Sequence, residues 1–356
     1  MATNLATASE TGSETDAVAD LRVGIVGCGY WGPKLARNFS ELPGSELGML
    51  CDLRDDRLSE IVKLYPQAAA TKRYEELLGG DLDAVAIATP VALHYPLAKA
   101  ALMAGKHVLV EKPITARSDQ AGELVSLAEK RGLTLMVGHT FVYNPAVEAV
   151  RRVIQSGELG RVYYLNCTRV NLGLLQPDIN VLWDLAPHDL SILHFVLGVE
   201  PVSVSARGAV YVNTYRNLPE VAYLVLRFPD GVMANLRLSW LDPVKERSLT
   251  VVGSRKMLVY DDIADDKVVV FDKGVDVPPY SVTEEEFRAS YRHGAATAVP
   301  LQWTEPLRVE CAHFIECIRT SAVPRSSGHD GLKIVQVLEA AQRSLLNGGV
   351  ELTVEY

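Results

Sequence analysis

A lysine at the end of a short apolar segment could take part in proton or hydride chemistry. Lys112 follows Val108-Leu109-Val110 and Glu111 and precedes Pro113, a pattern typical of a buried strand that ends at a sheet edge. In an open α/β sheet, ligands bind beyond the carboxyl ends of the strands, so Lys112 could reach a cofactor and a substrate together. The bond to Pro113 could be cis. Taken alone, a Glu-Lys pair is also typical of a solvated strand end.

Asp184 and His188 form a second candidate pair. They lie four residues apart and would share one face of a helical turn. Imidazole titrates near neutral pH, and a neighbouring carboxylate can orient it and stabilise its protonated form. The same spacing is also typical of helix capping by Asp184. The helix that follows is predicted over Asp189–Leu197.

A glycine motif lies near the start of the chain. Gly27, Gly29 and Gly32 form a GxGxxG pattern between an apolar strand, Leu21–Val26, and a predicted helix, Pro33–Leu42. In a dinucleotide-binding fold the first glycine permits a tight turn, the second lets the backbone approach a pyrophosphate, and the third packs helix against strand. The N-terminus of the helix would face the phosphates. The pattern predicts a dinucleotide cofactor.

Asp52 ends the next predicted strand, Glu46–Cys51, twenty residues after Gly32. An acidic side chain at this place accepts hydrogen bonds from the adenosine ribose. Because a carboxylate repels a 2′-phosphate, Asp52 favours NAD over NADP. Arg54 and Arg57 nearby leave room for the phosphorylated cofactor.

The elements that must position these residues predict an α/β protein. Strands and helices alternate over residues 21–138, which indicates a doubly wound parallel sheet, a Rossmann domain. Over residues 139–356 apolar and polar residues alternate in several segments, which are joined by turns such as Pro229-Asp230-Gly231. This second part is predicted to be an α+β domain with a large, mostly antiparallel open sheet. Residues 1–20 are small, polar and acidic, and we expect a disordered tail.

Composition limits the partners. A formal net charge of −9 argues against nucleic acid or an anionic membrane as the main partner, and the apolar runs are shorter than a membrane span. Five cysteines without CxxC spacing favour free thiols in a reducing, cytoplasmic compartment and predict no metal site. A small anionic ligand stays compatible with this charge because it needs only a local cluster of basic groups.

Three runs of residues resemble the Gfo/Idh/MocA family of NAD(P)-dependent sugar and polyol oxidoreductases. They are Gly27–Gly32, Thr89-Pro90, and Ala104–Val108 leading into Glu111-Lys112-Pro113. The resemblance implies a homodimer or homotetramer formed through the C-terminal sheet. It also implies cofactor contacts from the glycine loop, the strand ends and the Glu-Lys pair, at Gly27, Gly29, Tyr30, Trp31, Gly32, Asp52, Thr89, Pro90, His94, Glu111 and Lys112.

The same resemblance implies a DxxxH pattern at Asp184 and His188, with the histidine facing the nicotinamide. Lys112, His188 and Asp184 would then be catalytic. We expect His188 to accept the hydroxyl proton while Lys112 polarises the oxygen, although the two roles could be exchanged. A lysine acting as base would need burial or a nearby positive charge to lower its pKa.

Two further runs, Gly138–Pro145 and Val181–Asp189 with Asn171-Leu172-Gly173, resemble the branch that oxidises position 3 of nucleotide-linked amino sugars such as UDP-N-acetylglucosamine. The implied substrate contacts are Lys112, His139, Tyr143, Asn144, Arg169, Asn171, Asp184 and His188. Turn chemistry or strand-surface polarity would equally account for several of them. The alternatives are a polyol or inositol dehydrogenase, an NADPH-dependent keto-sugar reductase and, in another class, a non-catalytic NAD-binding sensor.

Overall fold

The computed structural model describes residues 19–173, 175–176, 178–212, 214–276 and 289–356, and the predicted tail lies almost wholly outside them. The first half of the chain forms a six-stranded, fully parallel sheet in the order β3-β2-β1-β4-β5-β6. Its strands are β1 (Leu21–Val26), β2 (Ser45–Cys51), β3 (Ala69–Thr71), β4 (Ala84–Ile87), β5 (His107–Glu111) and β6 (Leu135–Gly138). The helical segments between them are α1 (Gly32–Glu41), α2 (Asp55–Leu64), α3 (Tyr74–Gly79), η1 (Val91–Leu93), α4 (His94–Met103) and α5 (Ser118–Arg131).

This sheet is buried because helices cover both of its faces, so its strands consist of continuous apolar runs. All four residues of β4 are buried, as are the last four of β1. The strand order reverses between β1 and β4, and at such a switch point a crevice opens beyond the carboxyl ends of the strands. The predicted doubly wound parallel sheet of the Rossmann type is confirmed.

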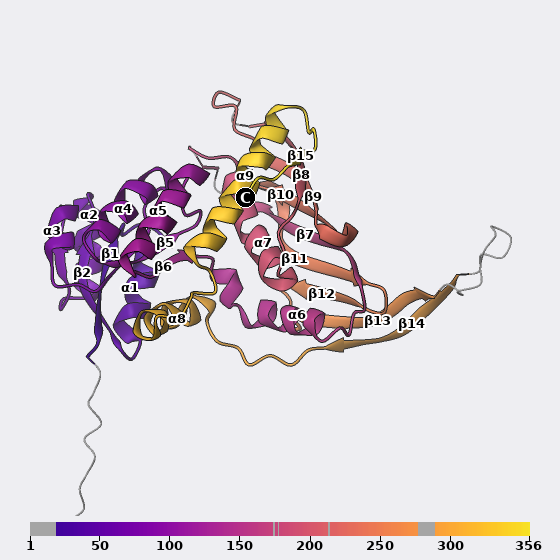
Figure 1. Ribbon diagram of the computed structural model, residues 1–356, viewed down its shortest axis with the longest axis horizontal. Coiled ribbons are helices and arrows are strands. Elements are labelled where there is room, and N and C mark those ends of the chain that lie inside the picture. The colour runs from indigo at the N-terminus through magenta and orange to yellow at the C-terminus, as the bar shows by residue number, and fades with distance from the viewer. Residues whose placement is uncertain (1–18, 174, 177, 213, 277–288) are drawn as a thin grey trace, which may run out of the picture.

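The second sheet has nine strands in the order β14-β13-β12-β11-β7-β10-β9-β8-β15. Its pairs are antiparallel except for β7 with β10, so the prediction of a mostly antiparallel sheet is confirmed. Its strands are β7 (Val162–Leu172), β8 (Ser203–Ala209), β9 (Val221–Arg227), β10 (Met233–Ser239), β11 (Leu241–Gly253), β12 (Met257–Asp261), β13 (Val268–Asp276), β14 (Ser290–Ala298) and β15 (Leu352–Thr353). In Figure 1 the β13–β14 pair extends outward as an arm.

Helices cover one face of the second sheet and connect it to the first. They are η2 (Thr140–Tyr143), α6 (Pro145–Gln155), α7 (Val181–Leu197), α8 (Pro306–Thr320) and α9 (Gly328–Leu346), whereas the short η3 (Pro229–Gly231) is the turn between β9 and β10. The last two return to the first sheet (Figure 1): α8 packs on α1, and α9 packs on α5 as well as on α7 and β8. Along the described part of the chain, no helix combines the length and apolar character needed to cross a bilayer.

The helix that carries Asp184 and His188 begins earlier than predicted. It starts at Val181 rather than Asp189, and its N-cap is Asn180, whose side chain accepts a hydrogen bond from the Trp183 backbone N–H. Pro187 lies inside the helix, where it removes one backbone donor. The helix continues through this position because ten of its other sixteen residues are buried, and that packing outweighs the local cost of a proline.

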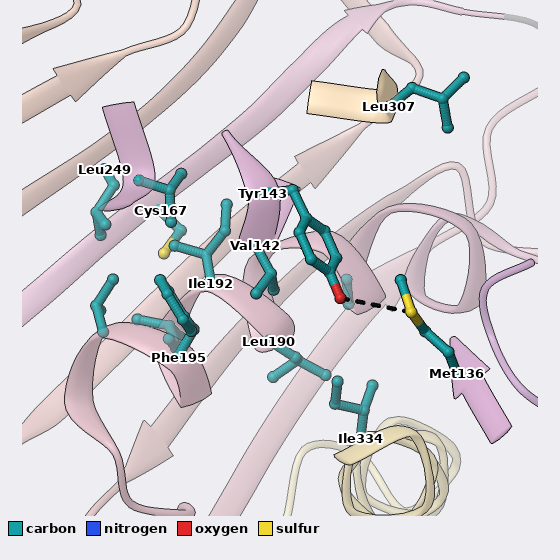
Figure 2. Packing of buried hydrophobic residues seen from close by; sticks show 14 of the residues in the cluster. Met136, Val142, Tyr143, Cys167, Leu190, Ile192, Phe195, Leu249, Leu307 and Ile334 are labelled. Carbon is teal, nitrogen blue, oxygen red and sulfur yellow. Dashed lines mark hydrogen bonds between the residues drawn. The ribbon is translucent and has the colours of Figure 1, made fainter. Parts of the chain in front are cut away.

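The core under η2 is apolar and tightly packed (Figure 2). Tyr143, Val142 and Ile192 are each less than 4% exposed. The Tyr143 hydroxyl lies 2.9 Å from Ser326 Oγ and 3.7 Å from Met136 Sδ. This packing holds η2 against α7 and so fixes the position of residues on both segments.

Candidate active site

A cleft of about 700 Å³ lies between the two sheets, within the range of small-molecule sites. Residues from the first domain, from the second sheet and from the helices between them line the cleft. The lining residues are Tyr30, Trp31, Lys34, Arg37, Glu111, Gly138, Thr140, Phe141, Asn144, Arg169, Val170, Asn171, Leu185, His188, Lys245, Arg247, Asp262, Trp303, Glu305, Pro306 and Leu307.

The glycine loop has the shape that a dinucleotide requires. Gly27 has a φ of +90°, a conformation that strongly favours glycine. A Cβ atom on Gly32 would lie 2.0 Å from the Gly27 carbonyl oxygen, whereas one on Gly29 would meet nothing within 4 Å. The loop is therefore closed by two glycines and open at the middle one, where a pyrophosphate could approach the backbone.

Asp52 is held beside this loop by two backbone donors. Its carboxylate accepts hydrogen bonds from the N–H groups of Cys28 (2.6 Å) and Arg54 (2.8 Å). The guanidinium of Arg54 turns toward Asp56, with Nε 3.1 Å from Oδ1. Because Arg54 is engaged with its own helix and Asp52 faces the loop, the arrangement suits the unphosphorylated ribose of NAD.

Two aromatic side chains of the glycine loop, Tyr30 and Trp31, line the cleft. Lys34 lies over both rings, with its Nζ 3.8 Å from the Tyr30 ring centre and 4.5 Å from that of Trp31. The hydrogen bond and charge of Lys34, together with the charges of Arg247 and Lys245, lower the pKa of Tyr30. Those two residues of β11 therefore face the glycine loop across the cleft.

Three further residues predicted to contact the cofactor come after the carboxyl end of β4. They are Thr89, Pro90 and His94. His94 is 1% exposed, and its two ring nitrogens lie 2.8 Å from the carbonyl oxygens of Pro113 and Thr89. His94 thus links the segments that follow β4 and β5, and it does not line the cleft. The Thr89 hydroxyl is buried without a partner among the described residues.

Lys112 reaches across from the first domain to α7. Its Nζ donates to the Asp184 carbonyl oxygen (2.8 Å) and to the Asp184 carboxylate (3.0 Å). Both side chains are largely covered, at 13% and 20% exposed. The structure therefore pairs Asp184 with Lys112 rather than with His188. The peptide between Lys112 and Pro113 is cis.

His188 stands one helical turn after Asp184 and faces the cleft. Its ring packs edge-on against Phe141, with 5.2 Å between centroids. Burial lowers the pKa of His188 well below its usual value, and the charges of Lys112 and Arg169 lower it further. The imidazole is neutral at physiological pH and can accept a proton.

Glu111 ends β5 on the cleft wall and is buried. Burial raises its pKa from 4.5 to about 7, against the opposing charge of Lys112. A second buried carboxyl, Glu310 of α8, accepts a 2.8 Å hydrogen bond from Thr140 Oγ1. Burial, and then the charge of Glu111, raise the pKa of Glu310 well above its usual value.

Arg169 and Asn171 approach the cleft along β7. Arg169 is 6% exposed and makes two hydrogen bonds, of 2.9 and 3.0 Å, to the Asp189 carboxylate. Its guanidinium also lies over the Phe141 ring at 4.4 Å. Because this buried pair is fully matched, Arg169 supplies a fixed positive charge beside His188.

Three predicted substrate contacts in the segment after β6 have other surroundings. Tyr143 is 3% exposed and belongs to the core, and His139 is 1% exposed; neither lines the cleft. Asn144 does line it, but its Oδ1 caps α6 through the Ala146 N–H and its Nδ2 lies 3.3 Å from Tyr260 Oη. Besides Asn144, this segment presents Thr140 and Phe141 to the cleft, and Gly138 at the end of β6 lines it as well.

The sequence prediction missed Lys245 and Arg247. Both lie on β11, two residues apart, so both side chains point to the same face of the strand. Arg247 Nη1 lies 3.5 Å from Asp262 Oδ2. The alternation of Lys245 and Arg247 along the chain was the signal that the sequence offered for a basic strand face.

Comparison with known proteins gives two family matches. Residues 21–139 match an oxidoreductase family with an NAD-binding Rossmann fold, GFO/IDH/MocA, and residues 147–259 match the GFO/IDH/MocA C-terminal domain. UDP-N-acetylglucosamine 3-dehydrogenase of Acidithiobacillus ferrooxidans is 33% identical over 222 residues, covering 62% of this chain and 67% of that protein. Myo-inositol 2-dehydrogenase of Thermotoga maritima is 24% identical over 339 residues, covering 91% and 96%.

Solved structures agree with the fold. The A. ferrooxidans enzyme superposes with a TM-score of 0.76 at 24% identity, covering 92% of this chain and 98% of that one. The structure of GenD2 from gentamicin A biosynthesis, in complex with NAD, gives a TM-score of 0.80 at 22% identity, covering 96% and 98%.

Proposed function

The chain belongs to the Gfo/Idh/MocA family of NAD-binding oxidoreductases acting on CH–OH groups, and on that premise we propose that it oxidises a secondary hydroxyl of a sugar. The favoured substrate is a nucleotide-linked amino sugar such as UDP-N-acetylglucosamine, oxidised at carbon 3. One observation carries the proposal: His188 lines a cleft beside an open glycine loop, and Lys112, which follows the cleft-lining Glu111, is ion-paired to Asp184 one turn before His188, close enough for its charge to lower the pKa of His188.

The roles of the two residues follow from their partners. Lys112 is ion-paired with Asp184, so it acts as a cation that polarises the substrate oxygen. His188 is neutral and accepts the hydroxyl proton. Gly27–Gly32 and Asp52 would hold NAD, which would supply the hydride acceptor for the same carbon.

The charge of the cleft supports a phosphate-bearing substrate. Five basic side chains line it against three acidic ones, although the whole chain has a net charge of −9. Among the described residues, neither Lys34 nor Lys245 forms an ion pair with a carboxylate. These two lysines, with Arg247 on the opposite wall, suit a diphosphate group at the cleft rim. A polyol would use none of this charge.

Exposed apolar residues support a second copy of the chain as partner. Tyr223 and Val225 of β9 and Met233 of β10 are 54%, 41% and 39% exposed on the sheet face away from the helices. Two copies could cover this face in a homodimer, or four in a tetramer. Light scattering of the purified protein should give at least twice the 38.9 kDa chain mass, and a monomer at micromolar concentration would contradict this.

Lys112→Met tests the chemistry. It should lower kcat at least about a hundredfold while calorimetry gives an unchanged Kd for NAD, because the glycine loop and Asp52 stay intact. Lys256→Met is the matched control, since Lys256 is also ion-paired, to Glu158 at 2.7 Å, but lies outside the cleft. Turnover of Lys112→Met close to that of the wild type would refute the role of Lys112.

A substrate panel tests the specificity. UDP-N-acetylglucosamine, free N-acetylglucosamine and myo-inositol are each offered with NAD and NADP, and reduced cofactor is followed by absorbance. We expect the highest kcat/KM with the nucleotide sugar and NAD, and Lys245→Ala should lower it through KM. Preference for myo-inositol, with no effect of Lys245→Ala, would instead support the polyol dehydrogenase alternative.

A further inference from the structure

Trp303 is an exposed tryptophan in the wall of the cleft. It is 54% exposed, whereas the other three of the four tryptophans are buried or half-buried. A single exposed aromatic residue on an open surface needs no explanation. Trp303 differs because it lines the candidate active-site cleft, where aromatic side chains commonly contact ligands. The surroundings of the ring therefore deserve a closer description.

The segment that carries Trp303 has no regular secondary structure but is anchored at both ends. It runs from the end of β14 back to α8 (Figure 1). At one end the Val299 N–H donates a 2.8 Å hydrogen bond to a carbonyl oxygen of β13, and Leu301 packs against the hydrophobic core. At the other end Glu305 forms an ion pair with Arg37 of α1. Because the backbone is already fixed, little conformational entropy would be lost when a ligand contacts the ring.

A lysine lies over the Trp303 ring. Lys267 Nζ is 5.2 Å from the ring centre, and the same ammonium donates hydrogen bonds to the carbonyl oxygens of Asp262 (2.9 Å) and Ala264 (3.2 Å). These bonds hold Lys267 in place, and its charge is attracted to the ring. The contact helps to fix the plane of the ring while more than half of Trp303 stays exposed. A planar ring held in this way can stack on another planar ring.

Trp303 also lies in the wall of a second hollow, of about 400 Å³. Among the described residues, it is the one that lines both this hollow and the cleft, so the two spaces adjoin at its side chain. The cleft, of about 700 Å³, has the size of a site for one small molecule, but hydride transfer brings a cofactor and a substrate together. The part of a large substrate that lies far from the reacting carbon therefore needs the space beyond the cleft.

The charges of the two spaces differ. Five basic and three acidic side chains line the cleft, whereas Asp265 and Asp266 face a single basic residue, Lys267, in the second hollow. Phosphate groups are therefore favoured in the cleft, and an uncharged group is favoured in the hollow. A nucleoside has this character. Its base offers a flat face to Trp303, and its ribose hydroxyls can donate hydrogen bonds to carboxylates.

We propose that Trp303 stacks on the base of a nucleotide-linked substrate and that the hollow beside it holds the nucleoside. The inference rests on the proposed function, in which the sugar lies at His188 and the diphosphate meets Lys34 and Lys245. Trp303 takes no part in proton or hydride transfer. It favours substrates that carry a nucleotide over free sugars, because a free sugar does not reach the ring.

Calorimetry with UMP and with ribose 5-phosphate, each at saturating NAD, separates the base from the phosphate. Wild-type protein should bind UMP at least about tenfold more tightly than ribose 5-phosphate. Trp303→Leu removes the ring and should abolish this preference, whereas Trp303→Tyr keeps a ring and should retain most of it. Tyr211→Leu is the matched control, since Tyr211 is a 66% exposed aromatic residue that lines neither space.

Tryptophan fluorescence and turnover give two further measurements. UMP should quench the fluorescence of the wild type, and this quenching should disappear in Trp303→Tyr although the nucleotide still binds. In turnover, Trp303→Leu should lower kcat/KM for UDP-N-acetylglucosamine, relative to that for free N-acetylglucosamine, at least about tenfold.

Equal affinity of the wild type for UMP and ribose 5-phosphate would overturn the proposal. So would a preference for UMP that survives in Trp303→Leu, or quenching that persists in Trp303→Tyr. If the wild type oxidises no sugar, the proposed function has failed, and the calorimetry still decides on Trp303. If Trp303→Leu oxidises UDP-N-acetylglucosamine with unchanged specificity, the proposed function stands and the nucleoside site is wrong.

Discussion

Replacing Glu111 by glutamine should make the protein more stable at high pH but not at low pH. Burial raises the pKa of Glu111 from 4.5 to about 7, so the folded protein binds this proton more tightly than the unfolded chain does. A difference of about 2.5 pKa units corresponds to about 3 kcal/mol. The ionised carboxylate therefore costs the folded state nothing below pH 4.5, an increasing amount up to pH 7, and about 3 kcal/mol above it.

Glutamine has nearly the same size and carries no charge at any pH, so it removes that cost. Differential scanning calorimetry of the cofactor-free protein at pH 5 and pH 8 should give nearly equal melting temperatures for wild type and Glu111→Gln at pH 5, where only about a quarter of the cost is present. At pH 8 the variant should melt roughly 5 °C higher. Glu60→Gln, at an exposed position of α2, should show no such pH-dependent gain.

The nearby Glu310 changes how much Glu111→Gln stabilises the protein at high pH. The charge of Glu111 is one reason for the raised pKa of Glu310, so removing it also lets Glu310 ionise at lower pH. Equal effects of Glu111→Gln at pH 5 and pH 8 would refute the reasoning, because they would mean that Glu111 ionises in the fold as it does in the unfolded chain.

Other substitutions test the cofactor loop and the buried ion pair. Gly32→Ala should weaken NAD binding at least about tenfold by calorimetry, since its Cβ would clash with a backbone carbonyl, whereas Gly29→Ala should leave the melting temperature of the cofactor-free protein unchanged. Asp52→Ser should raise kcat/KM with NADP relative to NAD. Arg169→Met and Asp189→Leu should each cost about 3–5 kcal/mol in denaturant unfolding, and the double variant much less than their sum.

The Rossmann half was predictable because its signals are local. A strand, a glycine turn and a helix follow one another within Leu21–Glu41, and the spacing of the glycines identifies the two, Gly27 and Gly32, that the turn requires for steric reasons. The start of α7 was not predictable in the same way. Pro187 is a helix boundary by local preference, and only tertiary packing keeps the helix continuous from Val181.

The segment after β6 shows why the substrate contacts were harder to predict. A sequence motif identifies the segment but not which of its side chains face the cleft. In η2 the chain turns tightly, so Thr140 and Phe141 line the cleft while Val142 and Tyr143 enter the core. That division depends on α7 and α8 packing against η2, which lie more than 35 residues away in sequence.

Helix α7 sets the electrostatics of the site from both sides of His188. Asp184 holds Lys112 of the first domain, and Asp189 holds Arg169 of the second sheet. Each carboxylate fixes a cation close enough to lower the pKa of His188. The two anchored cations therefore disfavour the protonated form of the His188 imidazole. The ion pair that joins the two domains and the ion pair buried inside the second domain therefore both keep His188 unprotonated.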